Sequence, residues 1–184
     1  MIAAVEDAIT ARARLLCGNR VRDVATIPAE WDANLLERVL RALPGVFIAF
    51  VGGADKTPGG TTASFDAIFS VIAVTNHASG ELARRRGDSR VIGAYDLIEL
   101  LIPGLHKLKV PDVGTLIFQR VENLYTGALD KLGIAAYAAL FAMPLSFDTP
   151  VDESTLAPFE TFTQTFAKPP AGDPSPTLTT TLPQ

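Results

Sequence analysis

The chain has 184 residues, 48% of them hydrophobic, and its formal net charge is −4 at pH 7. This length fits one domain with extensions, and the hydrophobic content is typical of a protein with a buried core. The acidic balance excludes nucleic-acid binding over the whole surface, so any such contact has to be local. The single cysteine, Cys17, excludes an intramolecular disulfide and a multi-cysteine zinc site and suits a reducing compartment.

The sequence shows no targeting or membrane signal. Glu6 and Asp7 stand where a secretory signal would have basic residues before an apolar run. The longest uncharged apolar stretch, residues 133–147, is too short to span a bilayer as a helix, and Pro144 interrupts it. We therefore expect a soluble protein that assembles in a cytoplasm and has no membrane partner.

Two helices with an extended segment between them are predicted at the start of the chain. Residues 3–17 have apolar side chains at helical spacing. The face predicted to point inward consists of Val5, Ala8, Ile9, Leu15 and Leu16. Residues 20–28 are predicted to be extended, and residues 29–43 to form a second helix that Pro44 and Gly45 end.

A change of periodicity then predicts a β-hairpin. Residues 46–51 are a continuous β-branched and aromatic run, as in a strand covered on both faces. Residues 65–74 are nearly as apolar on both faces and form the second strand. The glycine-rich residues 52–60 are the predicted connection, a long mobile tip.

A third helix, residues 93–102, stands between two predicted strand pairs. Tyr95, Ile98 and Ile102 recur at helical spacing, and Pro103 with Gly104 is predicted to end the helix. The second strand pair covers residues 113–121 and 134–147. The latter segment is equally helical by propensity, but Gly133 and Pro144 bound it and favour a strand.

These elements predict an α+β fold in a single domain over residues 1–148. It has a mostly antiparallel four-stranded sheet covered by about three helices. Residues 149–167 are predicted to form an extended C-terminal arm. Residues 168–184, rich in proline and threonine, are predicted to be a disordered tail.

The search for catalytic chemistry argues against an enzyme. Cys17 at the end of an amphipathic helix fits a buried structural thiol better than a nucleophile paired with His77 or His106. The two histidines have no nearby cluster of acidic or histidine ligands, so no metal or other cofactor is expected. Asp96 and Glu99 share a helix turn and fit a solvated face better than a catalytic pair.

The strongest charge feature is the run Arg84, Arg85 and Arg86, followed by Arg90, in an otherwise acidic chain. One interpretation is an interface with DNA or with an acidic ring of a partner protein. The other is a solvated loop. The arginines alone leave both open.

Three phenylalanines, Phe159, Phe162 and Phe166, lie beyond the last core strand. A thinly hydrophobic arm gains little by folding alone, yet it can add to an exposed sheet edge of a neighbouring subunit. Packing on its own domain is the alternative, and the sequence does not choose between the two.

The order of elements, together with three short motifs, resembles a family of Mu-like phage and prophage tail proteins. The motifs are residues 93–99 after the basic loop and the following residues 104–105, residues 116–118, and residues 159–162. The resemblance covers about residues 1–166. The proline- and threonine-rich tail departs from it.

This resemblance implies a tail terminator, similar in role to the small ring protein that ends the lambda tail tube. Such a protein forms a hexameric ring on the last layer of the tube, and of the sheath where the tail is contractile. It stops polymerisation and offers the surface to which the filled head joins. The implied partners are further copies of the chain, the tail tube protein, the sheath, head-completion or connector proteins, and DNA in the channel.

Two other classes stay open at this level. A head-completion or connector adaptor of the neck also forms rings. An enzyme whose site is assembled without a recognisable motif would show a deep polar pocket with a perturbed carboxylate or histidine.

Overall fold

The computed structural model describes residues 1–30, 32–54, 62–124, 126–148, 161–165 and 177–181. It divides into two units, Met1–Thr149 and Pro150–Gln184. The elements of the first unit, in chain order, are α1 (Ile2–Cys17), η1 (Gly18–Arg20), β1 (Asp23–Thr26), α2 (Ala33–Arg41), β2 (Gly45–Gly52), β3 (Thr62–Asn76), α3 (Glu81–Arg86), α4 (Ala94–Leu105), β4 (Lys109–Val110), β5 (Gly114–Thr115), β6 (Ile117–Asn123), α5 (Gly127–Lys131) and β7 (Ile134–Asp148).

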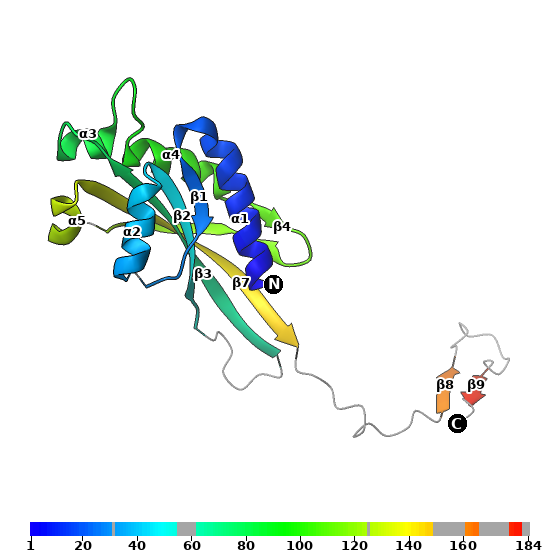
Figure 1. The fold of residues 1–184 in the computed structure, drawn as a ribbon. Coiled ribbons are helices and arrows are strands. Elements are labelled where there is room, and N and C mark those ends of the chain that lie inside the picture. Colours follow the sequence, from blue (N-terminus) through cyan, green and yellow to red (C-terminus); the bar gives the residue numbers. More distant parts are fainter. Residues whose placement is uncertain (31, 55–61, 125, 149–160, 166–176, 182–184) are drawn as a thin grey trace. The chain divides into compact units, whose positions relative to one another are not determined.

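A five-stranded mixed sheet in the order β1-β2-β3-β7-β6 is the centre of the first unit (Figure 1). The α+β class is confirmed, but the sheet has one strand more than the four predicted. The extra strand is β1, which pairs parallel to β2, with Val24 opposite Val46. Four residues are too short to show an alternating pattern, so the sequence marked this segment only as extended.

The predicted hairpin of β2 and β3 is confirmed, and β3 also pairs with β7 over its whole length, from Thr62–Asp148 to Asn76–Ile134. The apolar segment at residues 134–147 is therefore a strand. The strand predicted at residues 113–121 is divided between the short β5 and the longer β6. The hairpin tip, residues 55–61, lies outside the described residues.

The two faces of the sheet have different covers. α1 and α4 lie side by side (Figure 1) and pack on the face that carries Val46, Phe69 and Phe141. α2 packs on the opposite face, against Phe47 and Val74. Alternate residues of β2 and β3 thus enter two separate apolar clusters, as expected for strands covered on both sides.

The buried face of α1 differs from the predicted one at one leucine. Val5, Ile9, Ala13 and Cys17 are buried, each four residues from the next. Leu15 was predicted to face inward, but it is 77% exposed. The predicted inward face was wider than the buried one, because a helix that packs on a sheet buries only one stripe of its surface.

Helix α4 continues through Pro103 to Leu105, so the predicted helix end is wrong. The hydrogen bond that proline cannot donate would reach the carbonyl of Glu99, on the exposed side of the helix. A carbonyl that loses its helical donor is best tolerated on the solvent side of a helix, where water can bind it. Gly104 serves close packing instead, because a Cβ at this position would lie 2.4 Å from Leu16 Cδ1 of α1.

Arginine side chains occupy the free edge of β1. Arg14 donates to the carbonyl of Val24 from Nε (3.2 Å) and Nη2 (2.9 Å). Arg38 Nη2 donates to the carbonyl of Thr26 at 3.3 Å. Both outward carbonyls of this edge strand are therefore already hydrogen-bonded within the domain.

The second unit contains an antiparallel hairpin of β8 (Thr161–Thr165) and β9 (Thr177–Thr181). β8 lies in the predicted extended arm. β9 lies in the segment predicted to be a disordered tail, so these five residues differ from that expectation. The limits of arm and tail stay predictions.

Candidate functional site

The arginine run forms the short helix α3 between two glycines. Gly80 before it and Gly87 after it have positive φ angles of 102° and 69°, which glycine adopts without strain. The carbonyl of Arg84 accepts a 2.7 Å hydrogen bond from the hydroxyl of the buried Thr75 at the end of β3. The sheet therefore fixes the position of this helix.

Arg84 points into the domain. Its Nη1 lies 3.3 Å from Asp130 Oδ1 on α5, and its side chain is only 12% exposed. This ion pair joins α3 to α5 across 46 residues of sequence. Its position makes it a structural contact of the domain.

Arg85 also binds within the domain. Its Nη1 donates to the hydroxyl of Tyr95 at 3.1 Å, and its Nη2 donates to Glu81 Oε2 at 2.8 Å. These hydrogen bonds raise the pKa of the guanidinium. Arg85 thereby ties α3 to the first turn of α4.

Tyr95 in turn contacts Tyr137 of β7. Their rings meet edge to face with centroids 5.1 Å apart, and their hydroxyl oxygens are 3.4 Å apart. The hydrogen bonds from Tyr137 and Arg85 lower the pKa of Tyr95, whereas burial and the same contact raise the pKa of Tyr137 to about 12. The pair is a polar link between the sheet and the helices.

Arg86 and Arg90 are the arginines of this region that face solvent. The loop that carries Arg90 is held by Asp88, whose Oδ1 accepts from the backbone N–H groups of Arg90 (2.7 Å) and Val91 (2.8 Å). These bonds, with a further contact from His77, lower the pKa of the Asp88 carboxyl. The run predicted as one interface is thus divided into two inward and two outward arginines.

The aromatic arm is described at one of its three positions. Phe162 lies in β8 and pairs with Thr180 of β9. Phe159 and Phe166 lie outside the described residues. Their role in subunit contact stays a prediction.

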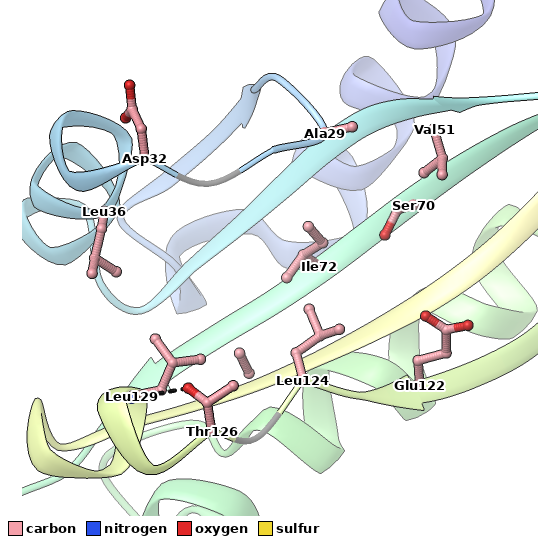
Figure 2. Close-up of a pocket in the computed structure, with 11 residues that line it drawn as sticks. Ala29, Asp32, Leu36, Val51, Ser70, Ile72, Glu122, Leu124, Thr126 and Leu129 are labelled. Atoms are coloured by element: carbon pink, nitrogen blue, oxygen red, sulfur yellow. Dashed lines mark hydrogen bonds between the residues drawn. The ribbon is translucent and has the colours of Figure 1, made fainter.

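A groove of about 510 Å³ lies on the α2 side of the sheet, and the sequence did not reveal it. Figure 2 shows Leu36 of α2, Ile72 of β3, Leu124 and Leu129 around this groove. Further lining residues are Ala29, Asp32, Val51, Ser70, Glu122, Thr126 and Ala136. These residues come from six segments, so no local motif could have marked the groove.

Nothing in the described residues has the form of a catalytic or metal centre. Within that part of the chain, no three histidine, cysteine or acidic residues gather closely enough to hold a metal ion. Cys17 is buried, and burial raises the pKa of its thiol. No helix in the described part of the chain is long and apolar enough to span a membrane.

The family model described as "Bacteriophage Mu, Gp37" matches residues 1–146, which is most of the first unit. The chain belongs to this family. The Gp37 family match therefore spans the five-stranded sheet, both helical layers and the arginine region.

Two relatives align over nearly the whole chain. "Mu-like prophage FluMu protein gp37" of Haemophilus influenzae is 29% identical over 166 residues, covering 90% of this chain and 81% of the relative. The "Probable tail terminator protein" of Escherichia phage Mu is 26% identical over 169 residues, covering 92% and 88% respectively.

Among solved structures, the chain is similar to one from the "Virion of native gene transfer agent (GTA) particle". The TM-score is 0.42 at 15% sequence identity, with 79% of this chain and 97% of that chain covered.

Proposed function

We propose that this protein is a tail terminator-like structural protein of a Mu-like phage or prophage. It caps the end of the tail tube, stops further polymerisation and presents the surface to which the head joins. The observation that carries the proposal is the alignment with the probable tail terminator of phage Mu, which covers 92% of this chain and 88% of that protein. The protein acts by assembly and has no catalytic role.

The assembled form in this proposal is a ring, with six copies implied by the resemblance to tail terminators. A head-to-tail interface between identical subunits closes into a ring when its rotation permits. The ring sits on the last layer of tube protein, with sheath and head-completion or connector proteins as further neighbours. It is assembled in the host cytoplasm and becomes part of the virion at the junction of tail and neck.

Arg86 and Arg90 are the proposed basic contacts of the ring, toward DNA in the channel or toward the acidic rim of a neighbouring ring. Both are exposed, whereas Arg84 and Arg85 hold α3 on the domain. Surface charges of this kind steer association and set specificity more than they add affinity.

The C-terminal arm, residues 149–167, is the proposed second contact between subunits. Phe159, Phe162 and Phe166 would supply its apolar part. A hairpin of two strands is marginally stable by itself in water, so β8 and β9 gain stability from any surface they cover.

The test is the mass of the purified full chain by light scattering, alone and mixed with tail tube protein, with tube lengths measured by electron microscopy. We expect a species of about six subunits, or one that appears only with tube, and tubes that stop growing. A strict monomer that leaves tube length unchanged would contradict the proposal. If the protein were instead recovered on isolated heads and not on tails, it would be a neck adaptor.

A further inference from the structure

The outer face of α1 is apolar although it faces solvent. Leu15 is the most exposed of the large hydrophobic side chains described, at 77%. Ala4 and Ala11, both exposed, precede it at helical spacing on the same stripe, opposite the buried residues. A monomer gains nothing from a leucine in that position.

Two arginines flank this stripe in fixed positions. Arg12 Nε donates to the carbonyl of Gly104 at 3.1 Å, and Arg14 donates to Val24 on the edge of the sheet. Neither bond neutralises the guanidinium charge, because both acceptors are backbone carbonyls. The outer face of α1 is therefore an apolar stripe with Arg12 along one side and Arg14, next to the exposed Asp7, along the other.

The groove on the opposite side of the sheet has the complementary character. Its inner surface is apolar, and Val51 at its end is 51% exposed. Asp32 and Glu122 stand among its lining residues, where Asp32 caps α2 and Glu122 contacts Arg120. Sheets of globular domains are normally covered by helices, and α2 covers only part of this face (Figure 2).

We propose that a second copy of this chain covers the groove, with Leu15 of its α1 packed against the exposed Val51. The apolar stripe of α1 meets the apolar groove, and Arg12 on the border of the stripe meets the carboxylate of Asp32. The helix of the second copy covers the part of this face that α2 and α5 leave open among the described residues. This inference rests on the proposed function and names the surfaces through which the ring closes.

The position of the two surfaces determines the symmetry. α1 packs on one face of the sheet and the groove lies on the other, so each copy offers a different surface to each neighbour. Such contacts are heterologous and propagate from copy to copy until the ring closes. A contact of α1 with α1 would instead stop at a dimer.

Disulfide cross-linking of the full chain tests this geometry directly. A chain carrying both Leu15→Cys and Val51→Cys is oxidised gently, alone and with tail tube protein, and separated on a denaturing gel. We expect a ladder of covalent oligomers up to the ring. The native Cys17 does not interfere, because its thiol is buried.

Variants with a single new cysteine distinguish a contact of α1 with the groove from a contact of α1 with α1. Leu15→Cys alone and Val51→Cys alone should give no covalent dimer, and a mixture of the two should give heterodimers only. A dimer from Leu15→Cys alone would show α1 packing on α1 and overturn the proposal. The matched control combines Val51→Cys with Leu82→Cys, a leucine on α3 that is also exposed (53%), and should give no ladder.

Charged variants give a second measurement that does not depend on oxidation. Leu15→Asp and Val51→Asp should each raise the protein concentration for half-assembly at least tenfold, and their mixture should stop at dimers. Leu82→Asp should assemble as the original chain does. If rings form and no link joins positions 15 and 51, this inference is wrong while the proposed function stands. If no ring forms under any condition, both are wrong.

Discussion

The two faces of the sheet differ in how completely the domain covers them. On one face, α1 and α4 bury Phe69, Phe141 and their neighbours almost completely. On the other, α2 leaves a groove in which Val51 is half exposed. The covered face carries the stability of the domain, and the partly open face has surface left for binding. Substitutions that separate these two roles test the comparison.

The largest effect is expected from Phe141→Ala on the covered face. Its side chain is fully buried and meets Phe118 edge to face at 5.7 Å, so removing it leaves a cavity. The free energy of unfolding should fall by about 3–5 kcal/mol. Urea denaturation measures it, with Val51→Ala on the open face as the control. A loss from Val51→Ala as large as that from Phe141→Ala would contradict the comparison.

Gly93→Ala should have the next largest effect, at the start of α4. A Cβ there would lie 2.2 Å from the backbone nitrogen of Gly87 and 2.4 Å from the carbonyl carbon of Arg86. Because backbone has to move, we expect a loss of about 1–3 kcal/mol. Gly127→Ala, where no atom lies within 4 Å, is the matched control and should change stability by less than about 0.5 kcal/mol.

Two arginines of α3 should affect different properties, Arg84 the stability of the domain and Arg86 its binding to partner proteins. Arg84→Ala removes the ion pair with Asp130 and should cost about 1–2 kcal/mol in thermal or urea unfolding. Arg86→Ala should leave stability within about 0.5 kcal/mol. Under the proposed function it should instead weaken binding to tube or neck proteins at low salt. Equal stability losses from both substitutions would remove the distinction between inward and outward arginines.

The smallest effect concerns the tyrosine pair. Because the pKa of Tyr137 is raised to about 12, its stabilising contribution is complete below the ordinary tyrosine value of about 10 and is lost as pH rises through about 12. Absorbance titration of tyrosinate should show one late ionisation that Tyr137→Phe removes. Arg85→Met should raise the pKa of Tyr95, since a hydrogen bond to its anion is lost. An unchanged titration in both variants would rule out the link.

The main elements of the fold were predictable because their signals are local. Apolar runs bounded by glycine and proline marked β2, β3 and β7, and helical spacing marked α1, α2 and α4. The parallel strand β1 was missed, since its partner lies across α2 and four residues carry no clear period. The end of α4 was misplaced because the cost of Pro103 depends on which side of the helix faces water.

The candidate surfaces were harder to predict, for a related reason. A run of arginines shows charge but not direction, and the inward turn of Arg84 depends on Asp130, far along the chain. Likewise, Leu15 fits the amphipathic pattern of the helix, but packing against the sheet determines which stripe is buried, and Leu15 lies outside it. The groove has no sequence signal at all, because Leu36, Ile72 and Leu129 meet only after folding.

The arginines on the edge of β1 have one more consequence. An open strand edge invites any extended chain to add to it, which is a common start of aggregation. With the carbonyls of Val24 and Thr26 already bonded to Arg14 and Arg38, that edge offers no ready acceptors to a stray strand. At high protein concentration these two arginines therefore disfavour aggregation by strand addition at the β1 edge.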